Sequence, residues 1–348
     1  MGGTKELKEK SMEMLKLKPA CKDYLWGGHR LVEEYGIDYP GEICAEAWTL
    51  SCHKDGESVV CDETACESEG GANVSAERND ENPARSKIAG KTLSEVIREN
   101  GKRILGTNCE KFEDFPILIK LIDAKKPLSI QVHPDDVYAL KNEGQYGKTE
   151  MWYILEAKEG AFLYQGFDHV ISKEEFEERI KNNTLEEVLH KVYVKRGDVI
   201  FISPGTLHAI GEGIVIAEIQ QNSNVTYRIY DYGRLGADGK PRQLHIKQSV
   251  DVTKLEPPAE YKAEGGHLAN CPYFQVDVIE VKEGDFYELN VDSSSFVNLL
   301  AIEGSACVSA YNSGQKVNIS KGESLFIPAG AGRVKIEGES RVILTRIP

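Results

Sequence analysis

The chain has 348 residues, of which 41% are hydrophobic and 28% charged, and its formal net charge is −14. This length suggests about two domains, and the hydrophobic fraction suffices for a globular core. The sequence shows no basic excess or stripe of the kind that nucleic-acid binders usually have, and no stretch is long and apolar enough to span a membrane. We therefore expect no nucleic-acid or membrane partner and no obligate protein partner.

Cysteine usage and the N-terminal sequence bear on the cellular compartment. The eight cysteines form no Cys-x-x-Cys pair, and in a chain of this size they are expected to be reduced thiols. Residues 1–18 mix lysine and glutamate with isolated apolar residues and lack the apolar core of a signal peptide. These features predict a cytoplasmic protein.

The first third of the chain is expected to hold two short helices and one clear strand. Residues 5–17 favour a surface helix, and residues 46–51 alternate as in a strand. Residues 61–87 are polar and predict an exposed loop. Residues 92–101 predict the second helix, because their Thr-Leu-Ser-Glu start allows a side-chain cap and an apolar stripe follows it.

Short strands dominate the middle of the chain. Residues 115–123 and 128–132 are apolar runs that are typical of buried strands. More strands are expected as far as residue 232, except at residues 172–190, where a charged segment carries apolar residues at helical spacing. The 32 glycines suit many strands joined by turns. We therefore expect a mainly β protein with a few helices.

An internal repeat predicts two related β-barrels. Residues 197–205 (GDVIFISPG) resemble residues 322–330 (GESLFIPAG), and the segments upstream, 154–160 and 299–304, also resemble each other. A strand, a glycine turn and a further apolar strand recur in this way in small antiparallel barrels. The alternative is that two similar turns arose independently.

The two copies differ at one position that bears on chemistry. Eleven residues after its opening glycine, the first copy has His208, whereas the second has Arg333. We therefore expect the functional site in the N-terminal region, residues 1–267, which includes the helical segment. The C-terminal region, residues 268–348, is expected to be a degenerate, structural barrel.

Four residues of the first barrel form a candidate set of metal ligands. Gln131 and His133 are two positions apart on a predicted strand, so their side chains face the same side. Glu150 opens the next apolar strand, and His208 follows a Pro-Gly turn. Two imidazoles, a carboxylate and an amide oxygen suit Zn²⁺, and also Mn, Fe, Co or Ni ions. Each residue alone is more often a hydrogen-bonded core or surface residue, and only the shared barrel frame gives the set weight.

Basic residues near this set suggest an anionic ligand. Arg228 and Arg234 are six positions apart, so they share a face if one regular strand carries both. Such a pair binds phosphate or stabilises negative charge on oxygen, although a solvated face with surface ion pairs is equally expected. Ser129 and Lys148, each two residues before a candidate metal ligand, are further candidates for binding an anion.

The motifs around these residues resemble type I mannose-6-phosphate isomerases, and the likeness covers almost the whole chain. The resemblance is closest to the shorter bacterial form, which lacks a large helical insertion. The segments that carry it are 26–28 (WGG), 46–48 (EAW), 127–135 (PLSIQVHPD), 148–152 (KTEMW), 204–210 (PGTLHAI) and 221–231 (QNSNVTYRIYD).

This resemblance implies a fold, a cofactor and roles for particular residues. The fold is that of two cupin-type jelly-roll barrels, the second degenerate. Phosphate binding is implied near Ser129 and Lys148, with Arg234 at a position where the family has a basic residue. Arg228 is implied in catalysis, and Glu218 in proton transfer. The implied cofactor is one zinc ion per chain, held by Gln131, His133, Glu150 and His208.

The implied reaction interconverts mannose 6-phosphate and fructose 6-phosphate through an enediolate, as a proton moves between C2 and C1. A Lewis acid and a fixed positive charge stabilise such an oxyanion. The sequence leaves open whether the base is Glu218, a water linked to His208 or another group. Two alternative functions are a metal-dependent cupin oxygenase, which the paired arginines and Gln131 disfavour, and a sugar-phosphate-binding protein without turnover, which the complete ligand set disfavours.

Overall fold

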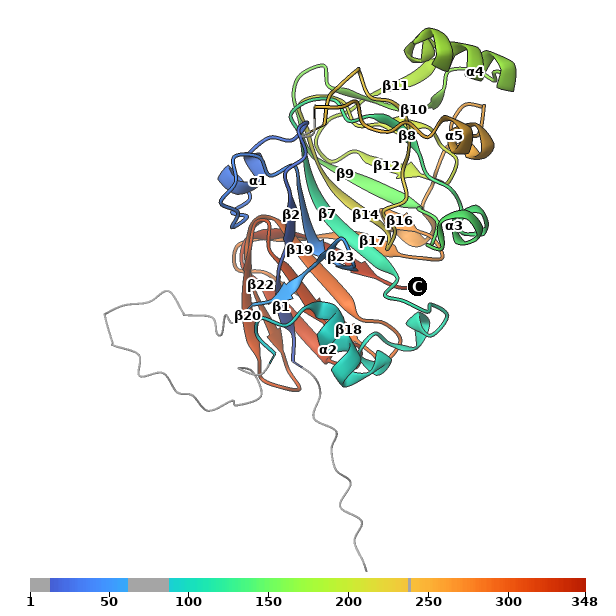
Figure 1. Cartoon of the computed structure of the whole chain (residues 1–348). Helices are drawn as coiled ribbons and strands as arrows, with labels where there is room; N and C mark the ends of the chain where they lie inside the picture. Colours follow the sequence, from blue (N-terminus) through green and yellow to red (C-terminus); the bar gives the residue numbers. More distant parts are fainter. Residues whose placement is uncertain (1–12, 62–87, 237–238) are drawn as a thin grey trace, which may run out of the picture.

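The computed structural model describes residues 13–61, 88–236 and 239–348 (Figure 1). In these ranges the chain is mainly β, as the sequence predicts. Strands from the middle of the sequence, green to yellow in Figure 1, lie in one half of the molecule, and the C-terminal strands, orange to red, lie in the other. The loop predicted at residues 61–87 falls outside the described residues except for Cys61.

The first β unit is built from two sheets with a shared apolar core. One sheet contains, in pairing order, β12 (Val199–Ile202), β9 (Glu150–Ala157), β14 (Ile214–Gln221), β7 (Ile117–Ala124), β3 (Glu46–Leu50) and β2 (Ala20–Lys22). The other contains β11 (Leu189–Tyr193), β10 (Phe162–Phe167), β13 (His208–Ala209), β8 (Ile130–Val132) and β15 (Tyr227–Tyr230). Ile216 of β14 and Leu163 of β10 belong to one buried cluster, so side chains of both sheets fill the space between them.

Two helices pack against the second of these sheets. α4 (Lys173–Asn182) buries Phe176, and α5 (Ile246–Val252) packs Ile246 against the same apolar cluster. The helix predicted at residues 172–190 is therefore only partly correct. A short 3-10 helix, η3 (Leu185–Glu187), follows α4, and the chain then enters β11, which pairs with β10.

The second β unit combines C-terminal strands with two short strands from the N-terminal part. In pairing order these are β16 (Ala269–Asn270), β17 (Gln275–Val281), β23 (Ser340–Arg346), β19 (Val297–Ala310), β21 (Ser324–Ile327), β1 (Leu15–Lys18) and β6 (Val59–Val60). Three more strands pair beside this path: β18 (Phe286–Val291), β20 (Lys316–Ser320) and β22 (Gly332–Glu337). Apolar side chains fill the interior of this unit.

Strand β1 corrects the prediction of a helix at residues 5–17. Residues 5–12 lie outside the described residues, but Leu15–Lys18 is a strand in which Leu15 pairs with Phe326 and Leu17 with Ser324. Residues of β1 also share a buried core with residues of both β units. The periodicity of this segment alone did not reveal the strand, because its partner lies near the other end of the chain.

The remaining elements are short. They are α1 (Arg30–Glu33), α2 (Leu93–Asn100), α3 (Asp136–Glu143), β4 (Cys52–His53), β5 (Gly56–Glu57), η1 (Lys102–Ile104), η2 (Thr107–Cys109) and η4 (Glu264–Gly266). α2 confirms the predicted helix and its cap, since the Thr92 side chain accepts from the Glu95 N–H and the Glu95 carboxylate accepts from the Thr92 N–H. In the part of the chain that the structure describes, no helix is long and apolar enough to cross a membrane.

The two copies of the predicted repeat have the same backbone turn. Gly197 and Gly322 have φ angles of +90° and +91°, and each precedes a strand, β12 or β21. Both positions lie in the left-handed region that glycine adopts without steric cost. Arg333, the counterpart of His208, lies on β22 and pairs with Glu288 at the surface, so the second copy has no imidazole at this position.

The cysteines agree only partly with the prediction of reduced thiols. Free thiols are found at Cys21, Cys44, Cys52, Cys61, Cys109 and Cys271. Cys307 of β19 is disulfide-bonded, so the prediction is wrong for this residue.

Candidate metal centre and adjoining cavity

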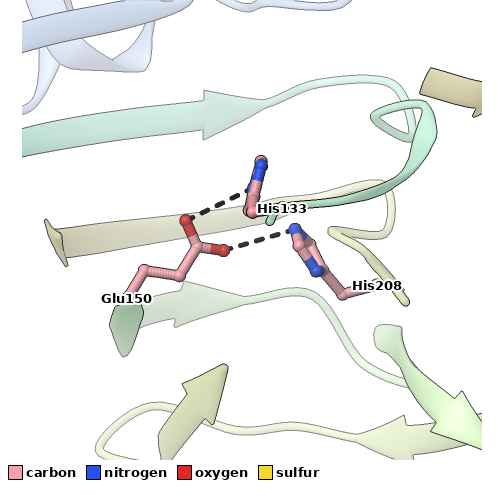
Figure 2. Close-up of side chains that lie close together, drawn as sticks. All are labelled: His133, Glu150 and His208. Atoms are coloured by element: carbon pink, nitrogen blue, oxygen red, sulfur yellow. Dashed lines mark ion pairs between the residues drawn. The ribbon is translucent and has the colours of Figure 1, made fainter. Parts of the chain in front are cut away.

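Three buried side chains from both sheets of the first β unit converge on one point (Figure 2). Glu150 opens β9 in one sheet, while His208 opens β13 and His133 follows β8 in the other. His208 Nε2 lies 3.3 Å from Glu150 Oε1, and His133 Nε2 lies 3.7 Å from Glu150 Oε2. Gln131 of β8 pairs with His208 in the sheet, so its backbone lies beside the cluster, and its Oε1 accepts from Ser129 Oγ at 3.4 Å.

Hydrogen bonds fix which nitrogen of each histidine faces the carboxylate. His133 Nδ1 lies 2.8 Å from the Val225 carbonyl oxygen, and His208 Nδ1 lies 2.9 Å from that of Thr206. Because a carbonyl only accepts, Nδ1 carries the hydrogen and Nε2 keeps a lone pair. Burial lowers the pKa of both histidines, to about 4 for His208, which keeps the rings neutral.

The donor atoms of this cluster fit a metal ion. Among the described residues no hydrogen bond reaches His133 Nε2, His208 Nε2 or Glu150 Oε1, although all three atoms are buried. Unpaired buried polar atoms are costly, and acceptors that face one another repel. The candidate ligand atoms lie within 4.8 Å of one another, and two imidazoles with a carboxylate are typical zinc ligands. A divalent cation would therefore satisfy atoms that the protein leaves without partners.

Lys148 lies beside this cluster rather than in solvent. Its Nζ is 2.8 Å from Glu150 Oε2 and 3.8 Å from Glu218 Oε1, and all three side chains are buried. Burial raises the pKa of Glu150 to about 7, although Lys148 acts in the opposite direction. The residue predicted to bind phosphate thus lies between two carboxylates next to the metal donors.

A second group of buried charges, which was not predicted from the sequence, lies next to Lys148 and Glu218. Lys120 Nζ of β7 lies 3.2 Å from Glu218 Oε1 and 3.5 Å from Glu46 Oε2. The indole N–H groups of Trp152 and Trp48 donate to Glu218 and Glu46, at 2.9 and 2.7 Å. The sequence did contain a signal for this ion pair: Lys120 lies inside the apolar run at residues 115–123, and a lysine is rarely buried without a charged partner.

The charges around Glu218 determine its protonation. Burial acts to raise the pKa of Glu218, but Lys148 and Lys120 outweigh it and lower the pKa to about 2. Glu218 is therefore a carboxylate at neutral pH. A carboxylate with so low a pKa is a weak base, and this bears on its predicted part in proton transfer.

A cavity of about 280 Å³ opens beside these groups. A larger cavity of about 800 Å³ lies against α2, but it contains none of the candidate residues, so the smaller one is the candidate substrate site. The polar and charged residues that line the smaller cavity come from both of its walls: Glu46, Lys120, Ser129, Gln131, Lys148, Glu218, Asn224, Thr226, Arg228, Arg242 and His245.

The two predicted arginines do not share a strand face. Arg228 lies on β15, half-buried, and its Nε donates to Ser129 Oγ at 3.2 Å. β15 ends at Tyr230, and Tyr232 has a φ angle of +55°, so the chain turns before Arg234. Among the described residues that line the cavity, Arg228 and Arg242 are present and Arg234 is not.

Arg234 is instead held by its neighbours. Its Nε donates to Asp231 Oδ1 at 3.1 Å and its Nη1 donates to the Pro127 carbonyl at 2.6 Å. The condition for a shared strand face, a regular strand from Arg228 to Arg234, is therefore not met. Arg242, in the irregular segment after β15, was missed because nothing in the local sequence pattern marks its position.

Fold and site together define a class of protein: a β protein of the cupin type with a buried His-Glu-His cluster beside a charged cavity. The family model described as "Phosphomannose isomerase type I, catalytic domain" matches residues 14–160. The family model described as "Mannose-6-phosphate isomerase, cupin domain" matches residues 264–347.

Individual relatives agree with the family models. The chain is 34% identical to a mannose-6-phosphate isomerase of Streptococcus mutans, with 95% of this chain and 97% of the relative covered. It is 33% identical to the mannose-6-phosphate isomerase ManA of Bacillus subtilis, with 96% and 99% covered. The crystal structure of the mannose 6-phosphate isomerase from Bacillus subtilis superposes with a TM-score of 0.81 at 32% identity, covering 96% of this chain and 99% of that one.

The chain therefore belongs to the type I phosphomannose isomerase family and is an isomerase. The resemblance inferred from the sequence motifs is confirmed. The mainly β, cupin-type fold that it implied is also confirmed.

Proposed function

We propose that this protein is a zinc-dependent aldose-ketose isomerase that interconverts mannose 6-phosphate and fructose 6-phosphate. The observation that carries the proposal is the convergence of unpaired, buried donor atoms of His133, Glu150 and His208 beside a cavity with basic side chains. The names of the relatives supply the substrate. One zinc ion per chain would be held by these three residues and Gln131, and would supply Lewis-acid polarisation of a substrate oxygen.

The reacting carbons would lie next to the metal donors. The reaction removes a proton from C2 and returns one to C1, so negative charge develops on the oxygens of an enediolate. Arg228 contributes a fixed positive charge for this oxyanion, since its guanidinium lines the cavity. Loss of one such donor typically costs about 2.7–4 kcal/mol of barrier.

Glu218 and Lys148 form an ion pair that would lie next to C1 and C2 of the substrate. Glu218 lines the cavity and is ionised, and its Oε1 lies 3.8 Å from Lys148 Nζ. With a pKa of about 2, Glu218 is better suited to holding Lys148 and the substrate hydroxyls than to keeping an abstracted proton. The base therefore stays open among Glu218, a water beside His208 and another group.

The phosphate end of the substrate would be fixed by hydroxyl and basic side chains that line the cavity. Of the three contacts predicted from the sequence, we keep Ser129, which lines the cavity, whereas Lys148 lies beside Glu150 and Arg234 does not line the cavity. Binding energy from this remote group would position C1 and C2 and would raise the rate rather than only the affinity. We keep the cytoplasm as the predicted location, with a sugar phosphate as the predicted small-molecule partner.

The test is the rate of fructose 6-phosphate formation from mannose 6-phosphate, measured in a coupled assay. The protein is assayed as purified, after treatment with a chelator, and after zinc is restored. We expect turnover to be lost with chelator and recovered with zinc. Absence of turnover in folded, zinc-loaded protein contradicts the proposed substrate, and dioxygen-dependent turnover with iron would instead support a cupin oxygenase.

A further inference from the structure

A cluster of cationic groups surrounds Asp231 on the wall formed by β15 and the segment that follows it. Asp231 is 5% exposed and accepts hydrogen bonds from both Arg234 and Arg242. Arg228, from β15, lines the cavity on the same wall as Arg242. Three guanidinium groups and one carboxylate leave two positive charges in excess here, although the whole chain carries −14.

The hydrogen bonds of Arg242 leave part of its guanidinium group for a ligand. Nε donates to Asp231 Oδ2 at 2.6 Å, and Nη2 donates to Asp231 Oδ1. Both bonds use one edge of the planar group, which locks its orientation without engaging Nη1 in the described structure. Arginine held in this way presents a preorganised donor, and its planar fork matches the oxygens of a phosphate.

Two more donors complete the same wall. The Arg228 backbone N–H donates to His245 Nδ1 at 3.3 Å, so the other ring nitrogen, Nε2, carries the hydrogen. His245 lines the cavity, as does Ser129, whose Oγ accepts from Arg228 Nε at 3.2 Å and donates to Gln131 Oε1 at 3.4 Å, a long hydrogen bond that a closer ligand oxygen can replace. Serine, arginine and neutral histidine donors thus border one part of the cavity.

The opposite wall has a less positive balance of charge. There Lys120 and Lys148 face three buried carboxylates, those of Glu46, Glu150 and Glu218. The two ammonium groups and three carboxylates sum to −1, and a bound Zn²⁺ would bring this wall to +1, whereas the three guanidinium groups and Asp231 of the arginine wall sum to +2. The charge distribution therefore favours the arginine wall for a phosphomonoester and leaves the carboxylate wall to the neutral carbons.

We propose that Arg242 is a specificity-determining residue that binds the phosphate group of the substrate, together with Ser129 and His245. This inference rests on the proposed function for the identity of the sugar. The binding of a phosphate group at this wall does not depend on the proposed function. It predicts that the protein distinguishes a sugar phosphate from the free sugar mainly through this wall, and that inorganic phosphate alone binds there.

The experiment measures binding of inorganic phosphate to the full-length, zinc-loaded protein by isothermal titration calorimetry. Arg242→Gln is expected to weaken binding on the order of 10- to 100-fold, since a charge-assisted hydrogen bond is lost. Arg242→Lys keeps the charge but not the fork, and is expected to recover part of the affinity. The control is Arg333→Gln, which removes an exposed arginine from an ion pair with Glu288 far from the cavity, and is expected to bind phosphate as the wild type does.

A second measurement separates this inference from the proposed function. If mannose 6-phosphate is turned over, Arg242→Gln is expected to raise KM by a similar factor, with a smaller change in kcat and an unchanged zinc content. If it is not turned over, the phosphate titration still decides the inference. Equal phosphate affinity of the wild type and Arg242→Gln, with the same far-ultraviolet circular dichroism, overturns it. Loss of binding in both Arg242→Gln and Arg333→Gln overturns it as well, because the effect is then not local.

Discussion

In the candidate metal centre, hydrogen bonds on the far side of each imidazole ring orient the two histidines. The carbonyls of Val225 and Thr206 hold the Nδ1 hydrogens of His133 and His208, so both Nε2 lone pairs are aimed at one point before any ion binds. Ligands that are oriented in advance bind a metal with little loss of side-chain entropy.

Removal of one of these ligands should therefore abolish both metal binding and turnover. We expect His133→Ala to lose more than the roughly 10- to 100-fold in zinc affinity that loss of a supporting residue costs, and to lose activity in parallel. Zinc is measured by mass spectrometry of the dialysed protein. His190→Ala is the control, because His190 is 44% exposed and pairs with Asp168 at the surface. Full zinc occupancy in His133→Ala would refute the assignment.

Asp231 is expected to make stability depend on pH. Burial acts to raise the pKa of Asp231, but hydrogen bonds from Arg242 and Arg234 hold it below its usual value. A lowered pKa in the folded state stabilises the fold above the unfolded pKa of about 3.9. That stabilisation is lost as the pH falls through the folded pKa.

The matching variant is Asp231→Asn. Its free energy of unfolding in urea is expected to be about 1–3 kcal/mol lower than that of the wild type at neutral pH, and the difference is expected to shrink near pH 3. A difference of the same size at both pH values would show that the charge of Asp231 is not the cause.

At the scale of elements, the turn between β12 and β13 positions two candidate metal ligands, His133 and His208, at once. Gly205 has a φ angle of +83°, and its N–H donates to the His133 carbonyl at 2.8 Å, three residues before His208. A Cβ atom at this position would lie 2.8 Å from the Val252 carbonyl oxygen. At Gly160, where φ is +73°, a Cβ atom would meet nothing within 4 Å.

These two glycines form a matched pair for mutation. Gly160→Ala is expected to lose about 1 kcal/mol of stability, from the left-handed backbone alone. Gly205→Ala adds a clash with backbone and is expected to lose about 2–4 kcal/mol and to bind zinc more weakly. Chemical denaturation and zinc titration of both variants measure this. Equal losses in the two variants would mean that the clash is relieved without moving the ligands.

Elements with a strong local signal were predictable from the sequence, and those that depend on distant partners were not. β7 and the capped helix α2 follow from an apolar run and a Thr-to-Glu capping pattern. β1 was mistaken for a helix because the strand that it joins, β21, is remote in sequence. Arg242 was missed for a related reason: the irregular segment after β15 has no periodicity from which a side chain's direction follows.

For the whole molecule, one shared core links the two β units. The largest described apolar cluster includes Leu15 of β1, Ile119 of β7, Met151 of β9 and Leu300 of β19. Residues predicted as separate regions, 1–267 and 268–348, thus contribute to the same buried surface. Such sharing favours cooperative unfolding, because neither part keeps its core when the other unfolds.

We therefore expect a single transition in differential scanning calorimetry of the full chain. The calorimetric and van't Hoff enthalpies should agree closely. A chain that ends at residue 267 is expected to aggregate or to lack cooperative unfolding, because Leu15 and Leu17 lose the strand that covers them. Two well-separated transitions in the full chain would show instead that the parts fold independently.

The position of β1 also constrains the order in which the chain folds during translation. The Met14 N–H donates to Gln315 Oε1, which lies 301 residues later in the chain, and β1, which pairs with β6 on one edge, finds the partner of its other edge only when β21 has been made. Proteins usually fold from the N-terminus as they leave the ribosome, and closing so long a loop is slow. The edge of β1 that pairs with β21 must therefore stay open until translation is nearly complete. In this interval nascent chains are most exposed to pairing with one another, so the yield of active protein should depend more on the rate of release and on chaperones than on the stability of the finished fold.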